Sequence, residues 1–147
     1  MKTCLLFSLF IALLSCQKES SSDFYVKYSA YNIGYEVIGD SLYVTRVQMK
    51  FDNPTSATPS ESLSEKYAQK ISKSQIEDLK NLIAKSGFWN TEKNEYGAPS
   101  TERYYPYVLH IKENGREREI IYRSHPNYEP SPKFLEEIAQ FLNQMAN

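Results

Sequence analysis

The segment 104–123, with the sequence YYPYVLHIKENGREREIIYR, carries the strongest local structural signal in the chain. Two apolar runs flank Asn114-Gly115, the preferred loop of a type I′ β-hairpin, because both loop residues need a positive φ. This loop length sets a register in which opposite charges and matched apolar side chains face each other, and a one-residue slip would destroy every match. The register pairs Glu113 with Arg116, Lys112 with Glu117, Leu109 with Ile120 and Tyr107 with Tyr122.

A second hairpin is predicted upstream of this one. The runs 35–38 and 41–44 flank Gly39-Asp40, and a glycine in the first loop position suits a type II′ turn. The resulting register places Val37 opposite Leu42 and Tyr35 opposite Val44, all on one face. The neighbouring segments predict a strand over 23–31, a surface loop over 52–62 and a further strand over 65–71.

Two amphipathic helices are predicted from capping residues and apolar spacing. The first begins after Ser72, which forms a capping box with Gln75, and ends at Gly87. The second has Pro132 in its first position, after Ser131 as the N-cap. Each helix carries an apolar stripe that should face a core. The stripes are Ile76, Leu79, Leu82 and Ile83 in the first helix, and Phe134, Leu135, Ile138, Phe141, Leu142 and Met145 in the second.

These elements together predict one α+β domain over residues 24–147. Their order along the chain is β-β-(β)-α-β-β-α, and the economical way to bury both helices and strands is in two layers. We therefore expect a single antiparallel sheet of four or five strands with two helices packed on one face. Residues 90–103, which contain Gly97 and Pro99, are expected to form a long polar loop before the second hairpin.

Composition narrows the classes of function. The 147 residues are the length of one domain, and the net charge of −1 lacks the basic surplus that a nucleic-acid-binding protein needs. Two cysteines and two histidines leave little for a metal site or a disulfide scaffold. Aromatic residues make up 14% of the chain, enough for a packed core. We expect no cofactor, no metal and no nucleic-acid partner.

The first sixteen residues, MKTCLLFSLFIALLSC, have the pattern of an export signal. Lys2 supplies a positive start, and the apolar run from Cys4 to Leu14 is eleven residues long, whereas a membrane-spanning helix needs about 20. The run ends in Leu13-Leu14-Ser15-Cys16, which resembles the lipobox of bacterial lipoproteins. An ordinary secretory signal, cleaved nearby with Cys16 incidental, is the alternative interpretation.

The lipobox resemblance implies a location and an anchor. Residues 1–15 would be a signal peptide removed before Cys16, whose sulfur would carry diacylglycerol and whose amine would be acylated, as with palmitate. Residues 16–23 would form a polar tether, and the acyl chains would hold the protein on a membrane. Gln17 is similar to the residue after the cysteine in outer-membrane lipoproteins, so the expected location is the cell envelope, at the outer membrane.

The order of elements also resembles other small domains. It looks like that of small bacterial lipoprotein domains with a ββαββα pattern. It is distantly similar, over Tyr31 to Met145, to emfourin-type metalloprotease inhibitors through two hairpins, an S-x-x-Q-I-x-x-L helix at 72–79 and a helix that starts with proline. The Ser-Gly-Gly-rich N-terminal stretch expected of those inhibitors is missing, so no inhibitory residue is assigned.

Catalytic motifs are absent from the sequence: it has no H-E-x-x-H, C-x-x-C, G-x-S-x-G or phosphate-binding glycine loop. The hairpin register places His110 opposite Glu119, a pairing that could create a general base. A cross-strand polar pair facing solvent is the simpler interpretation. Arg116, Arg118 and Arg123 share the hairpin with several glutamates, which predicts a solvated strand face of mixed charge. We expect no enzymatic activity.

Aromatic residues concentrated around the second hairpin form the candidate interaction surface. Tyrosine and tryptophan combine apolar area with a polar tip, which suits protein interfaces and stacking on sugars. The expected function is a non-catalytic protein-interaction module with a partner in the envelope, and the alternative is a saccharide-binding accessory lipoprotein. Rings that only cap the core are the competing structural interpretation. The surface comprises Trp89, Tyr96, Tyr104, Tyr105, Tyr107 and Tyr128.

Overall fold

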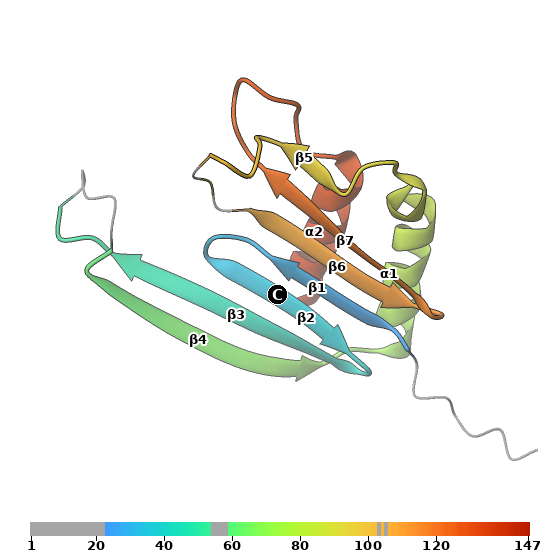
Figure 1. Ribbon diagram of the computed structural model, residues 1–147. Coiled ribbons are helices and arrows are strands. Elements are labelled where there is room, and N and C mark those ends of the chain that lie inside the picture. The colour runs from blue at the N-terminus through green and yellow to red at the C-terminus, as the bar shows by residue number, and fades with distance from the viewer. Residues whose placement is uncertain (1–22, 54–58, 103, 105) are drawn as a thin grey trace, which may run out of the picture.

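The domain consists of one seven-stranded sheet with both helices behind it (Figure 1). The structure is a computed structural model that describes residues 23–53, 59–102, 104 and 106–147. The α+β class is therefore confirmed. The predicted signal peptide 1–15 and the lipidation site Cys16 lie outside the described residues. The elements are β1 Tyr25–Ser29, β2 Ile33–Ile38, β3 Ser41–Lys50, β4 Glu61–Lys70, α1 Lys73–Lys85, a 3₁₀ turn Phe88–Asn90, β5 Glu95–Gly97, β6 Tyr107–Glu113, β7 Arg116–Arg123 and α2 Lys133–Met145.

The sheet joins the two predicted hairpins through β1. The strand order is β4-β3-β2-β1-β6-β7-β5, so β1 pairs with β2 on one side and β6 on the other. Both predicted registers are confirmed: Val37 lies opposite Leu42, and Leu109 lies opposite Ile120. The turns also behave as expected, since Gly39 has φ +59°, and Asn114-Gly115 has φ +52° and +73°.

The expected count of four or five antiparallel strands is wrong, because the sheet has seven strands and includes a parallel pair. The three residues of β5 lie in the predicted loop 90–103 and pair in parallel with β7. A strand this short shows no alternation, and its hydrogen bonds come from a strand far along the chain. β4 also begins at Glu61, inside the predicted 52–62 loop, because an exposed edge strand needs no apolar alternation.

The helix termini follow their capping chemistry with one exception. Ser72 Oγ accepts a hydrogen bond from the Gln75 backbone N–H at 3.2 Å, and Gln75 Oε1 accepts from the Ser72 N–H at 2.9 Å, which confirms the capping box. Gly87, beyond the end of α1, has φ +84°. In α2 the N-cap is Pro132 rather than Ser131, and no side chain caps this end.

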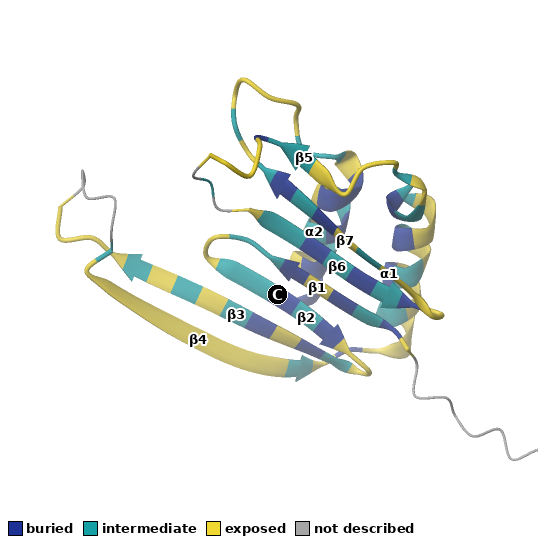
Figure 2. Ribbon diagram, viewed as in Figure 1, coloured by how far each residue is buried: buried dark blue, intermediate teal, exposed yellow. Residues whose placement is uncertain are grey.

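The core lies between the sheet and the two helices. Figure 2 shows buried residues along the centre of β1, β2, β6 and β7, whereas β4 is exposed along nearly its whole length. The α2 stripe is largely buried as predicted, although Phe141 is only partly so. Because the helices cover one face of the sheet, every second side chain of each central strand points to the other, uncovered face.

Arg118 holds the segment that follows α1 against this core. Its guanidinium donates to the carbonyl oxygens of Trp89 at 3.1 Å and Thr91 at 2.5 Å. It also reaches the carbonyl oxygens of Phe88 and Lys93 at 3.4 and 3.3 Å, and Nε donates to Asn94 Oδ1 at 3.0 Å. The predicted mixed-charge face of solvated residues therefore does not include Arg118, which is half-buried and bonded to the backbone.

Candidate binding site on the open face of the sheet

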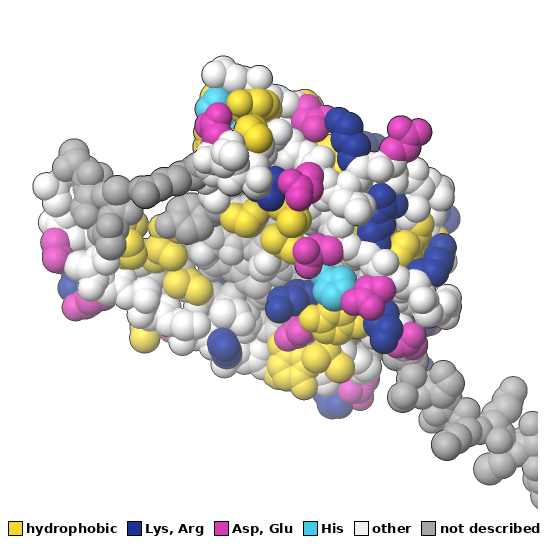
Figure 3. Space-filling model, in the orientation of Figure 1, with side chains coloured by type: hydrophobic (Ala, Val, Ile, Leu, Met, Phe, Trp, Pro, Cys, Tyr) yellow, Lys and Arg dark blue, Asp and Glu magenta, His cyan; other side chains and the backbone are white. Residues whose placement is uncertain are grey.

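The uncovered face of β1 to β4 exposes large apolar side chains. Ile38 and Tyr43 lie on this face because their neighbours Val37, Leu42 and Val44 point into the core. Ile38 is 48% exposed and Tyr43 44%. Figure 3 shows hydrophobic side chains gathered beside charged groups on this face of the molecule. An apolar area rimmed by charge is the arrangement expected of an interaction surface.

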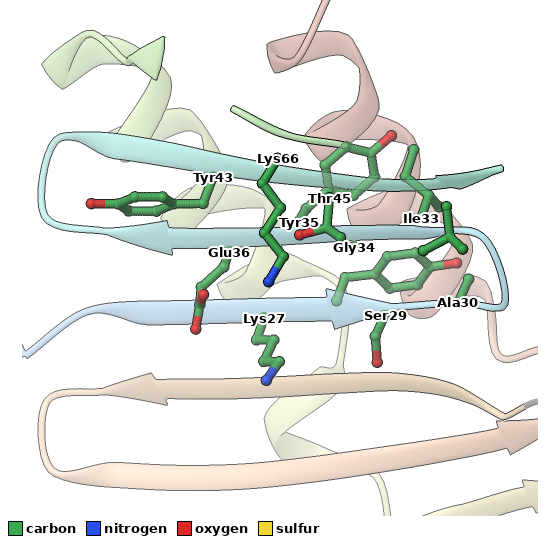
Figure 4. Close-up of a pocket in the computed structure, with 12 residues that line it drawn as sticks. Lys27, Ser29, Ala30, Ile33, Gly34, Tyr35, Glu36, Tyr43, Thr45 and Lys66 are labelled. Carbon is green, nitrogen blue, oxygen red and sulfur yellow. The ribbon is translucent and has the colours of Figure 1, made fainter. Parts of the chain in front are cut away.

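A hollow of about 310 Å³ lies beside this apolar patch (Figure 4). Gly34 forms part of its lining, between Ser29 on β1 and Thr45 on β3. A Cβ atom at Gly34 would meet the carbonyl oxygen of Tyr28 at 3.7 Å and Thr45 Cβ at 3.8 Å, both ordinary contacts. A side chain added at Gly34 can therefore begin without a clash at its Cβ atom and would extend into the hollow.

Two lysines give the open face of β1 to β4 a positive character. Lys66 reaches from β4 across the face toward Glu36, and Lys27 extends from β1 (Figure 4). Among the described residues neither ammonium group forms an ion pair. Glu36 accepts a hydrogen bond from the Tyr25 hydroxyl at 2.7 Å, and burial together with this bond raises the pKa of Tyr25. The surface can therefore offer two unpaired cations to a ligand.

His110 lies farther along the same face, in the register that the sequence predicts. It is opposite Glu119, but its Nε2 lies 2.8 Å from Glu117 Oε1. The edge of its ring contacts Tyr25, with ring centroids 5.5 Å apart. The expected partner is thus replaced by a diagonal neighbour two residues along β7. No group of His, Cys, Asp and Glu within the described part of the chain is arranged to hold a metal ion.

The predicted aromatic surface is divided by the fold. Trp89, Tyr96 and Tyr107 pack against the core as partly buried side chains. The Arg116 guanidinium lies 4.4 Å from the centroid of the Trp89 ring, so one face of the indole is already stacked. Tyr105 lies outside the described residues. The three packed rings match the interpretation in which the aromatics cap the core.

Tyr104 and Tyr128 remain on the surface, in a cluster around Glu102. Both hydroxyls donate to its carboxylate, at 2.8 Å from Tyr104 and 3.1 Å from Tyr128. These two hydrogen bonds lower the pKa of Glu102, and the bond from Tyr104 has the larger effect. The His125 ring lies between the two tyrosine rings, 5.2 Å from each centroid. Because these groups satisfy one another, they offer fewer free polar atoms than the open face.

The open-face site was not found from the sequence because its residues come from separate strands. Its signal is present in the first hairpin, where a register that buries Val37 and Leu42 must turn Ile38 and Tyr43 outward. What the sequence does not reveal is that no third layer covers them. It also does not reveal that the β3–β4 pairing sets Lys66 opposite Thr45, diagonally next to Tyr43.

Comparison with known proteins adds no relative. No protein-family model matches this chain, and no curated protein matches it. Among the described helices, none has both the length and the apolar character needed to cross a membrane.

Proposed function

We propose that this protein is a cell-envelope lipoprotein, attached through Cys16 to the outer membrane, whose open sheet face binds a partner protein without catalysis. The observation that supports this function is the uncovered face of β1 to β4, where Ile38 and Tyr43 are exposed and Tyr43 lines a hollow together with two unpaired lysines. The lipobox-like sequence 13–16 supports the anchor. The anchor restricts the protein to partners within reach of the membrane surface.

The chemistry of the face defines the partner. Fully burying an exposed aliphatic or aromatic side chain contributes about 1.5–3 kcal/mol, so Ile38 and Tyr43 together can anchor an interface. Lys27 and Lys66 would meet carboxylates at the rim, which improves specificity and the rate of association more than affinity. We therefore propose a partner that presents an apolar side chain flanked by acidic residues. The saccharide alternative has no comparable support, because Arg116 occupies one face of Trp89.

Photo-crosslinking in intact cells tests this surface. Benzoylphenylalanine in place of Tyr43 should form a discrete adduct with one envelope protein on irradiation, because the side chain lies at the centre of the interface. Adding Lys66→Glu should lower the adduct yield severalfold, since it places a like charge against the partner's carboxylates. Adding Gly34→Val should also lower the adduct yield, because the valine side chain would fill the hollow. Mass spectrometry would give the mass of the adduct.

The matched control places benzoylphenylalanine at Leu63. This residue is 59% exposed on β4, but its side chain points to the opposite side of the sheet from Tyr43. It should give no discrete adduct. The assignment of the open face would be contradicted by an adduct at position 63 with none at position 43. It would also be contradicted if the adduct yield at position 43 stayed unchanged when either substitution was added.

Lipid attachment is tested by a cysteine exchange. Cys16→Ser should abolish incorporation of labelled palmitate and move the protein from the membrane fraction to the soluble fraction, because a hydroxyl cannot form the thioether. The control is Cys4→Ser, which alters the only other cysteine and should keep the full label. Palmitate retained in Cys16→Ser, or an unmodified thiol found at Cys16 in the wild-type protein, would refute the anchor.

A further inference from the structure

A row of tyrosines crosses the helix-covered face of the sheet beneath α2. Direct strand pairing places Tyr35 beside Tyr28, and Tyr107 and Tyr96 on either side of Tyr122. The row continues between the pairs, because the β1–β6 register sets Tyr28 diagonally next to Tyr107. At one end, the Tyr35 hydroxyl donates to Asn143 Oδ1 of α2 at 2.8 Å. Among the residues described, no hydrogen bond joins the middle of the row to the helix.

A cavity of about 530 Å³ separates this middle part of the row from α2. Its volume is in the range of small-molecule sites. Leu135 and Ala139 supply the apolar wall on the helix side. The polar lining consists of Tyr28, Tyr107, Tyr122, Ser124, Ser131 and Glu136.

The tyrosine hydroxyls in this cavity lack partners in the part of the chain that the structure describes. Tyr28 and Tyr122 are only 7% and 8% exposed, yet within the described residues no hydrogen bond joins either hydroxyl to another group. Neither is sealed off, because the one fully buried polar side-chain atom without a partner in the described residues is Trp89 Nε1. The hydroxyls therefore reach the space of the cavity. Both side chains are more than nine-tenths buried while their hydroxyls stay open to the cavity, so a ligand can supply the hydrogen-bond partner that the fold does not.

The polar side chains that line the cavity include one charged group, the Glu136 carboxylate, and its negative charge favours a cation. All of them end in oxygen: three phenols, two serine hydroxyls and one carboxylate. No lysine or arginine of the described chain lines it, and the nearby Lys133 is paired with Glu137 at 3.1 Å. Burial raises the pKa of Tyr28 to about 12, so its phenol stays a neutral hydroxyl at pH 7. Hydroxyl oxygens accept hydrogen bonds from an ammonium group, and Glu136 at the exposed mouth supplies the opposite charge.

We propose that this cavity binds a primary alkylammonium ion, with its N–H groups on the tyrosine hydroxyls, its charge near Glu136 and its alkyl chain against Leu135 and Ala139. This inference is independent of the proposed protein-binding function, because the cavity lies on the helix side of the sheet. The site discriminates by charge and by hydrogen-bond donors, since an alcohol of equal size has one donor and no charge.

Titration calorimetry of the full-length protein in detergent tests the site with n-butylammonium chloride. We expect a dissociation constant on the order of 1 mM, and much weaker binding of 1-butanol. Tyr28→Phe should weaken butylammonium binding about tenfold, because it removes one hydroxyl acceptor. The substitution should leave the thermal unfolding midpoint of the free protein unchanged, because that hydroxyl has no internal partner.

Charge is tested on the helix. Glu136→Gln should weaken butylammonium binding about fivefold. Glu137→Gln changes the next residue, which pairs with Lys133 and lies outside the cavity lining, and should leave the affinity unchanged. The proposal is overturned by equal binding of butylammonium and butanol, by no binding of butylammonium, by a hexose that binds in its place, or by unchanged affinity in both cavity variants.

Discussion

Gly97→Ala is expected to lower the free energy of unfolding by about 4 kcal/mol, an effect that combines two penalties. Gly97 has φ +77°, which is unfavourable for any residue with a Cβ atom. An added Cβ would also overlap the carbonyl oxygen of Arg123, and would lie 2.9 Å from its carbonyl carbon and 3.0 Å from the Tyr122 ring. Each penalty contributes about 1–3 kcal/mol. Domains are stable by only about 5–15 kcal/mol, so the variant would be close to unfolding.

The steric part of this effect arises because the backbones of β5 and β7 approach closely. The Ala98 N–H donates to the Arg123 carbonyl oxygen at 2.9 Å, on the same atom that a Cβ at Gly97 would overlap. The strand cannot move away without losing this bond and the parallel pairing. We therefore expect faster hydrogen exchange at the Ala98 amide as well as lower global stability.

Gly87→Ala is the matched control for the backbone angle. Gly87 has φ +84°, but nothing lies within 4 Å of the position that its added Cβ would take, so only the angle is penalised, at about 1 kcal/mol. Urea unfolding followed by the fluorescence of Trp89, the single tryptophan, gives both values. Equal losses for the two variants would show that the close approach of β5 to β7 is not a constraint.

The two hairpins could be predicted because their information is local. A turn such as Asn114-Gly115 fixes the register, and the pairing of Leu109 with Ile120 then checks it within a short stretch of sequence. The capping box at Ser72 is local in the same sense. Such features depend only on residues close together in the chain, so they can be predicted without knowing the fold.

The features that could not be predicted depend on contacts between distant segments. β5 has too few residues to show a pattern, and only β7 makes it a strand. The aromatic set illustrates the same limit, because composition cannot distinguish a ring under a loop, such as Trp89, from one on the surface, such as Tyr128. The open face around Tyr43 exists only because both helices lie on the other side of the sheet.

Arg118 shows how identical sequence patterns hide different roles. It occupies the same arginine–glutamate alternation as Arg116, whose side chain is 56% exposed. Both side chains lie on the face that carries the core, Arg116 opposite Glu113 and Arg118 opposite Ile111, but Arg118 is half-buried and its guanidinium bonds to the segment that follows α1. Among the described residues, no backbone N–H donates to the carbonyl oxygens of Trp89 and Thr91, and the guanidinium supplies their donors.

Arg118→Met is accordingly expected to lower the free energy of unfolding by about 3 kcal/mol. The methionine fills much of the same space but leaves the carbonyl oxygens of Trp89 and Thr91 without a donor. The fluorescence of Trp89 should shift to longer wavelength in the folded variant, because the segment loosens and the indole meets water. Urea unfolding and the emission spectrum at zero denaturant measure the two effects.

Two further variants separate geometry from charge. Arg118→Lys keeps the positive charge but cannot span acceptors on several sides at once, so it should recover less than half of the lost stability. Arg116→Met removes a guanidinium that stacks on Trp89 from the same strand, and should cost about 1 kcal/mol or less because it is solvent-exposed. Full recovery by lysine would mean that charge alone matters at position 118. A larger loss of unfolding free energy at position 116 than at position 118 would show that the stack of Arg116 on Trp89 holds this segment more strongly than the bonds from Arg118 to the carbonyl oxygens.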